Sequence, residues 1–165
     1  MRGLNNHERF HAPDKHREYL TPDELERFLA VEAATENERQ VQIAFGFSCM
    51  TGLRLGDVRQ LRRGDIKPMG EGWAVSIVQQ KTGSPVTVPL NGLALSLLPP
   101  RPENDDENVF RLPGKSGKVT KHGRSIRDKA GITGKDLTYH CSRYADFFIM
   151  PIFGERNLMF SILAS

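Results

Sequence analysis

The sequence lacks the features of secreted, membrane-spanning and disulfide-stabilised proteins. Among 165 residues it has two cysteines, Cys49 and Cys141, which we expect to be buried, reduced thiols in a cytoplasm, although a disulfide between them stays open. No apolar run is long enough to cross a membrane, and the N-terminus has no apolar core for a signal peptide. With 26% charged and 38% hydrophobic residues, the composition indicates one globular domain.

Motifs for nucleotide, metal and acyl-transfer chemistry are also missing. A phosphate-binding loop G-x-x-x-x-G-K-[ST] that ends at Lys115-Ser116 would need glycine where Val109 stands. There is no G-x-S-x-G and no H-E-x-x-H. The histidines at positions 7, 11 and 16 have no cysteine or paired carboxylate to complete a metal site. We therefore expect neither a metal nor a cofactor.

The formal net charge is only +3, but acidic and basic residues are segregated along the chain. From Glu18 to Glu38 there are seven acidic residues and one basic residue, whereas from Arg111 to Arg143 there are nine basic and two acidic residues. A one-sided positive field suits a polyanion such as DNA, and the alternative is a solvated lysine-rich surface. The basic residues that we expect to face DNA are Lys115, Lys118, Lys121, Arg124 and Arg127.

Helical patterns dominate the first part of the chain. Residues Thr21 to Glu24 form a capping box that starts a first helix. A second helix should bury one face and end at Gly52. Its inward residues are predicted to be Val41, Ala44, Phe45, Ser48 and Cys49. A third, shorter helix should end at Gly64-Asp65.

The pattern changes to period two between Trp73 and Leu90. Turn residues interrupt it at Thr82–Pro85, which predicts a β-hairpin with a third short strand near Ile66. Further helices are predicted over 93–98 and 118–130, and Thr138 can cap a last one. The expected fold is α+β, mainly α, with a small antiparallel sheet at one edge. We expect residues 1–19 to be a flexible lead-in or linker and residues 20–165 to be one domain.

Three separate motifs carry residues suited to a phosphodiester. T-G-L-R-L-G-D-V-R-Q-L contains Arg54 and Asp57, Q-Q-K-T-G contains Lys81, and L-T-Y-H-C-S-R contains His140 and Arg143. In this order and context the motifs resemble the catalytic domain of tyrosine recombinases, the phage integrase family. The resemblance covers most of the chain and implies double-stranded DNA as the partner.

The resemblance also implies a role for each of these residues. Arg54 and Arg143 would hold the non-bridging phosphate oxygens, for which planar guanidinium groups are suited. His140 would share a helix face with Arg143 and transfer a proton. Lys81, on a mobile hairpin, would act as general acid toward the leaving 5′ oxygen, and Asp57 would hold the Arg54 guanidinium. We expect the set to converge on one positively charged pocket.

The sequence departs from the family after the H-x-x-R motif, where the family places its tyrosine nucleophile. No tyrosine stands between Tyr144 and Ser165, and Tyr139 lies within the motif itself. The expectation is a domain that lacks the nucleophile segment and binds DNA weakly without cleaving it. The apolar segments 147–153 and 158–164 predict self-association, and a homo-oligomer on DNA is expected by analogy with the family.

Three functions stay open at this point. The first is a catalytic-domain fragment of a phage or mobile-element enzyme for site-specific recombination or integration, acting in the bacterial cytoplasm or nucleoid. The second is a DNA-binding remnant or regulatory module that keeps the phosphate-binding residues but performs no chemistry. The third is an unrelated basic interaction domain. Mutation of Arg54 and Arg143 separates the third from the others, because phosphate contacts dominate DNA affinity.

Overall fold

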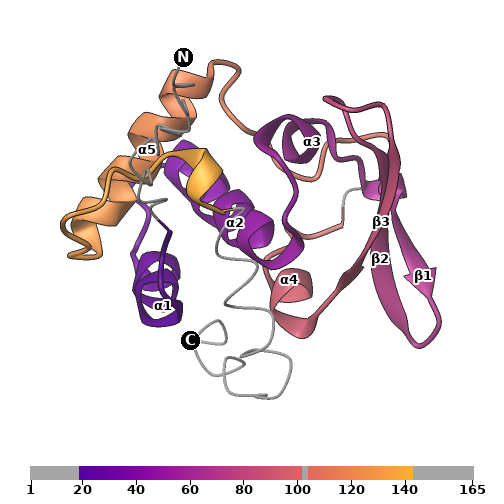
Figure 1. Cartoon of the computed structure of the whole chain (residues 1–165), viewed down its shortest axis with the longest axis horizontal. Coiled ribbons are helices and arrows are strands. Elements are labelled where there is room, and N and C mark those ends of the chain that lie inside the picture. The colour runs from indigo at the N-terminus through magenta and orange to yellow at the C-terminus, as the bar shows by residue number, and fades with distance from the viewer. Residues whose placement is uncertain (1–18, 102–103, 143–165) are drawn as a thin grey trace, which may run out of the picture.

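The computed structural model describes residues 19–101 and 104–142. Helices gather around one central helix, and a three-stranded antiparallel sheet lies at one side (Figure 1). The fold class predicted from the sequence is confirmed. The elements are α1 (Pro22–Ala30), α2 (Glu36–Thr51), α3 (Leu55–Gln60), the 3-10 helix η1 (Arg63–Asp65), β1 (Ile66–Met69), β2 (Gly72–Val78), β3 (Pro85–Leu90), α4 (Gly92–Ser96), α5 (Ser116–Lys129) and the 3-10 helix η2 (Tyr139–Cys141).

Helix α1 has a side-chain partner at each end. At its start, Thr21 Oγ1 accepts the Glu24 N–H at 3.3 Å and Glu24 Oε2 accepts the Thr21 N–H at 2.7 Å, so the predicted capping box is confirmed. At its end, the buried amide of Gln42 donates to the carbonyls of Phe28 at 2.8 Å and Val31 at 2.9 Å. A polar residue of α2 thus satisfies carbonyls that the helix itself leaves without partners.

The central helix α2 is buried on all sides over its last three turns. Every residue from Gln40 to Thr51 is buried, whereas the sequence pattern predicted a single inward face. Helices α1, α4 and α5 and strand β3 all contact α2. Gly46 leaves room for two leucine side chains, since a Cβ there would lie 2.8 Å from Leu29 Cδ2 and 3.0 Å from Leu97 Cδ1. The one-face prediction was wrong because α4 and α5 come from distant parts of the chain.

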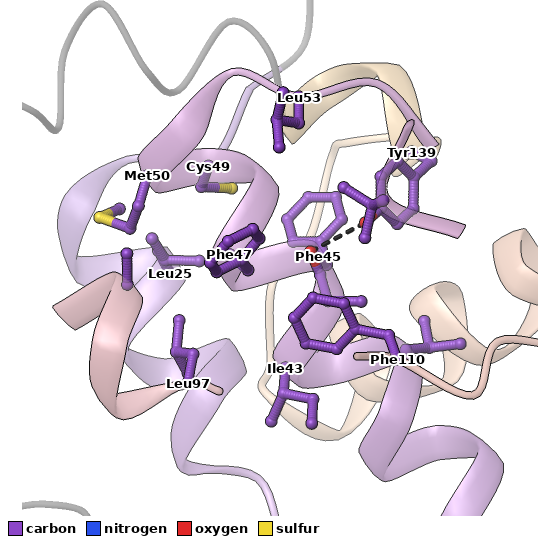
Figure 2. Packing of buried hydrophobic residues seen from close by; sticks show 14 of the residues in the cluster. Leu25, Ile43, Phe45, Phe47, Cys49, Met50, Leu53, Leu97, Phe110 and Tyr139 are labelled. Atoms are coloured by element: carbon purple, nitrogen blue, oxygen red, sulfur yellow. Dashed lines mark hydrogen bonds between the residues drawn. The ribbon is translucent and has the colours of Figure 1, made fainter. Parts of the chain in front are cut away.

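Aromatic rings join these elements into one core (Figure 2). The ring of Phe45 lies 5.1 Å from Phe28 and 5.7 Å from Tyr139, and Phe47 lies 5.2 Å from Phe110, measured between centroids. Burying one such ring stabilises the fold by about 1.5–3 kcal/mol. The contacts therefore fix α1, η2 and the segment before α5 against the same helix.

Helix α3 ends earlier than the sequence predicted. It stops at Gln60, whereas Gly64-Asp65 was the predicted end, so that boundary was wrong. Leu61 takes an extended backbone, and its carbonyl accepts the Val109 N–H at 2.8 Å. This pairing with a distant segment draws the chain out of the helix, and residues Arg63–Asp65 form a separate 3-10 turn.

The sheet confirms the predicted hairpin and its third strand. Strand β2 pairs with both neighbours, and Val75 lies opposite Ile66 on β1 and Val88 on β3. Val75 and its neighbour Ala74 are both buried, so the two faces do not alternate cleanly between core and solvent. Trp73 stays 40% exposed at the start of β2. The β2–β3 turn lies at the other end of β2.

A buried carboxylate joins α5 to α2. The Glu38 side chain is only 9% exposed and accepts hydrogen bonds from Lys129 Nζ at 2.7 Å, Ser125 Oγ at 2.8 Å and the Ala34 N–H at 2.9 Å. These donors lower the pKa of Glu38 to about 2, although burial acts in the opposite direction. Glu38 is therefore ionised at neutral pH and tethers α5 through two of its side chains.

Candidate functional site

Arg54 lies at the junction between α2 and α3. Helix α2 ends at Gly52, which has φ of 68° and donates its N–H to the Ser48 carbonyl at 2.8 Å, as the sequence predicted. Arg54 follows as the half-buried N-cap residue of α3, and its Nη1 donates to Gln79 Oε1 at 3.2 Å. Among the described residues, Gln79 is the sole hydrogen-bond partner of this side chain. A guanidinium has five N–H donors, so most of them are left for a ligand.

The turn that carries Lys81 connects β2 and β3, and we refer to residues 79–84 as the Lys81 turn. Gln79 and Ser84 close it through an N–H to carbonyl bond of 2.9 Å. Gly83, with φ of 66°, donates its N–H to the Gln79 carbonyl at 2.8 Å. Lys81 is exposed within this turn, directly after the residues that contact α3.

Asp57 connects α3 to the Lys81 turn. Asp57 is only 5% exposed, and its Oδ1 accepts the Gln80 N–H at 2.9 Å. Its other oxygen, Oδ2, is buried without a hydrogen-bond partner among the described residues. Gly56 lets the Gln80 side chain come close, since a Cβ there would lie 2.5 Å from Gln80 Oε1. Within the described ranges no hydrogen bond or ion pair joins Asp57 to Arg54. The Asp57 carboxylate therefore holds the Lys81 turn, whereas the family resemblance implied that it holds the Arg54 guanidinium.

His140 lies on η2, which Tyr139 anchors to α2. The buried Tyr139 hydroxyl donates to the Ala44 carbonyl at 2.8 Å (Figure 2). It also lies 2.7 Å from Ser48 Oγ. Burial raises the pKa of Tyr139 well above its usual range, although the Ser48 hydrogen bond and the nearby charge of Arg59 act in the opposite direction. His140 itself is exposed.

The predicted last helix is only partly within view. Thr138 is its N-cap residue, as predicted, but the described residues after it form a 3-10 turn, Tyr139–Cys141. Arg143 lies outside the described residues, as do Tyr144 and the apolar segments 147–153 and 158–164. The structure thus brings Arg54, Asp57 and the Lys81 turn together. Tyr139 anchors η2, which carries the exposed His140, to α2. The convergence of the whole predicted set stays a prediction.

The lysines predicted to face DNA form an exposed row at the start of α5. Lys115 is the N-cap residue, and Lys118 and Lys121 follow at intervals of three residues, which places them along one side of the helix. All three residues are exposed. Within the described ranges, no ion pair involves these three side chains. The row can therefore meet an anionic surface without breaking a contact seen here.

The two arginines of the same group are engaged within the fold. Arg124 pairs with Asp136 at 2.7 Å. Arg127 pairs with Asp128 at 2.6 Å and also donates to the Lys135 carbonyl at 2.8 Å, and its side chain is only 18% exposed. Both arginines thus help to hold the segment after α5. Their contact with DNA stays a prediction.

Sequence reasoning missed the residues that hold the site together, namely Gln79, Gln80 and Tyr139. The two glutamines carry no periodic signal, because they contact α3 from the end of a strand. A signal did exist for Tyr139, since Leu137, Tyr139 and Cys141 alternate with polar residues and all three are buried.

Other kinds of site find little support in the described part of the chain. No group of three His, Cys, Asp or Glu side chains lies close enough together there to hold a metal ion. Across residues 19–101 and 104–142, no helix combines the length and apolar character needed to span a bilayer.

Comparison with known proteins gives matches at the level of structure. No family model matches the sequence, and no curated protein matches it. A XerH site-specific recombinase bound to its difH substrate superposes with a TM-score of 0.60 and 20% identity, over 84% of this chain and 44% of that chain. XerA recombinase gives a TM-score of 0.57 and 22% identity, over 81% of this chain and 50% of that chain.

The catalytic core of lambda integrase is also similar, with a TM-score of 0.57 and 23% identity. This match covers 79% of the present chain and 81% of that core. The chain thus spans half or less of the XerH and XerA chains but most of an isolated catalytic core. At these identities the likeness concerns the fold alone.

Proposed function

The chain has a tyrosine recombinase/integrase-like fold, and from this premise we propose that it acts in site-specific DNA recombination or integration. It would form part of a catalytic domain that breaks and rejoins double-stranded DNA through a phosphotyrosine intermediate. The observation that carries the proposal is that the Lys81 turn is bound to Arg54 and also to Asp57 on α3. A guanidinium with donors to spare, beside a lysine-bearing turn, fits a backbone phosphate.

The proposed chemistry assigns each cation a place around one scissile phosphate. Arg54 and Arg143 hold the non-bridging oxygens, where negative charge develops during attack. Lys81 protonates the leaving 5′ oxygen, which an exposed lysine on a turn can reach. The exposed His140 exchanges a proton or donates to the phosphate. Asp57 supports the set by holding the Lys81 turn on α3.

The partner in this proposal is double-stranded DNA, bound mainly through its phosphates. The exposed row of Lys115, Lys118 and Lys121 supplies contacts that do not depend on sequence. Lambda integrase forms a dimer on a core site and a tetramer on a Holliday junction. We propose a homo-oligomer on DNA for this chain as well. The site of action is then the bacterial cytoplasm or nucleoid.

The position of Tyr139 favours a second candidate function, which is DNA binding without cleavage by the 165-residue chain. Its hydroxyl is buried and held by Ala44 and Ser48, and its pKa is raised, so it is poorly suited to attack a phosphate. A suicide duplex that traps covalent adducts tests this point. No adduct on a denaturing gel is the expected result, and an adduct mapped to Tyr139 contradicts both the inactivity and the placement of the site.

The proposed phosphate site is tested by the affinity for a short random-sequence duplex at low salt. Arg54→Ala should weaken binding roughly tenfold, because it removes a charged phosphate contact. Lys67→Ala is the matched control, since Lys67 is an exposed lysine on β1 that pairs with Ala74, away from the Lys81 turn. Equal affinity of both variants and the unmodified chain in fluorescence anisotropy would overturn the assignment.

A further inference from the structure

The side chain of Gln79 joins Arg54 to the Lys81 turn. Its Oε1 accepts from Arg54 Nη1 at 3.2 Å and from Thr82 Oγ1 at 3.1 Å. Its backbone closes the same turn, because the Gln79 N–H donates to the Ser84 carbonyl at 2.9 Å. One carboxamide oxygen thus touches the guanidinium on one side and the turn on the other.

We propose that Gln79 is a positioning residue that fixes the plane of the Arg54 guanidinium and couples it to the turn that presents Lys81. The inference rests on the proposed function, in which both cations act on one phosphate. A guanidinium on a flexible side chain loses rotational freedom when it binds, and a bond made beforehand reduces that loss. The pair then meets DNA as one preformed unit.

The contact orients Arg54 and does not block it. A carboxamide is neutral, so it leaves the positive charge of the guanidinium in place, whereas a carboxylate would compete with the phosphate. The bond uses Nη1 alone, and the other donors stay available for two phosphate oxygens. Thr82 holds the same Oε1 atom from the other side, so Gln79 itself is restrained.

A second connection keeps the turn in place without the Gln79 side chain. The buried carboxylate of Asp57 accepts the Gln80 N–H at 2.9 Å, and Gly56 makes room for the Gln80 side chain. Loss of the carboxamide at position 79 should therefore release the guanidinium while the turn stays docked. This separation makes the inference testable apart from the stability of the fold.

The test compares Gln79→Met, which keeps the length of the side chain but lacks an acceptor oxygen, with Gln79→Glu. Gln79→Met should weaken binding of a random-sequence duplex about threefold to tenfold. In an Arg54→Ala background the same change should have no further effect, because its target is gone. Gln79→Glu keeps the bond to Arg54 but should also weaken DNA binding, because its charge competes with phosphate.

A measurement without DNA separates the positioning role of Gln79 from the proposed phosphate site at Arg54. In the free protein, Gln79→Met should increase the motion of the Arg54 Nε–H group in ¹⁵N relaxation and leave the Gln80 amide protected from exchange, while Gln79→Glu should leave both unchanged. Tighter DNA binding by Gln79→Met, an unchanged Arg54 signal, or an additive loss in the Arg54→Ala background overturns the positioning role and leaves the phosphate site standing. An Arg54→Ala variant with unchanged DNA affinity overturns both.

Discussion

The charged residues at the two ends of the central helix α2 have different surroundings. Near the start of α2, the Glu38 carboxylate is buried and accepts three hydrogen bonds, one of them from a lysine. Just beyond its end, Arg54 is half-buried and meets one neutral acceptor among the described residues. A charge whose partners are complete stabilises the fold, whereas a charge with spare donors is prepared for a ligand. The difference supports a structural role for Glu38 and agrees with the phosphate-binding role proposed for Arg54.

The largest expected effect on stability is at the start of α2. Glu38→Gln should lower the free energy of unfolding by about 1–3 kcal/mol, because it weakens the bonds to Lys129, Ser125 and Ala34. DNA affinity should stay unchanged. Arg54→Ala should show the reverse, with a change in unfolding free energy within about 0.5 kcal/mol. Urea unfolding of both variants checks this, and equal destabilisation would remove the contrast.

Acid should abolish the advantage that Glu38 gives. Its pKa is about 2 in the folded chain against an ordinary value of 4.5, so its stabilisation is complete above about pH 5 and is lost as the pH falls toward 2. The pKa of Glu24 is lowered as well, since its hydrogen bonds outweigh the effect of burial. Glu24 therefore adds to the acid sensitivity of the unmodified chain and of Glu38→Gln alike. The stability gap between the unmodified chain and Glu38→Gln should therefore narrow with acid. A gap that stays constant would contradict the assigned pKa.

Tyr139 offers a test of how η2 is held. Tyr139→Phe removes the hydroxyl that bonds to Ala44 and Ser48, and it should cost about 1–2 kcal/mol. The double variant Tyr139→Phe/Ser48→Ala should lose less free energy of unfolding than the two single variants lose together. The reason is that Ser48→Ala also removes the hydroxyl that Tyr139→Phe leaves without its partner. Thermal or urea unfolding of the three variants gives the coupling. Full additivity would show that the two hydroxyls act independently.

The smallest effect is expected from the lysine row on α5. A Lys118→Ala/Lys121→Ala variant should bind random DNA more weakly and reduce the slope of log affinity against log salt by about 2. Stability should stay within about 0.5 kcal/mol, since these exposed side chains make no ion pair within the described ranges. Lys67→Ala serves again as the control. A slope that does not change would place the DNA elsewhere.

Local signals in the sequence predicted much of the fold. The capping box at Thr21, the stop at Gly52 and the β2–β3 hairpin are each encoded within a few neighbouring residues. The burial of α2 on all sides was not predictable in this way. It depends on α4 and α5, which reach the helix from much later in the chain.

The candidate site was predictable as a set of motifs but not as a set of contacts. Arg54 and Lys81 stand in motifs that resemble a known family, and the structure joins their segments. The bonds that do so link residues 25 and 23 positions apart, through Gln79 and the Asp57–Gln80 pair. No periodicity or composition reports such a pairing, since it arises only when α3 and the hairpin are already packed.

The anchoring of η2 also determines when the core around α2 can finish folding during synthesis. Ala44 and Ser48 both bond to Tyr139, which follows them by 95 and 91 residues. Until Tyr139 has left the ribosome, one side of α2 exposes apolar surface that includes Phe45. Contacts between such distant residues form slowly, and the exposed surface invites aggregation in the interval. Chains stalled before residue 139 should therefore be the ones that depend most on chaperones.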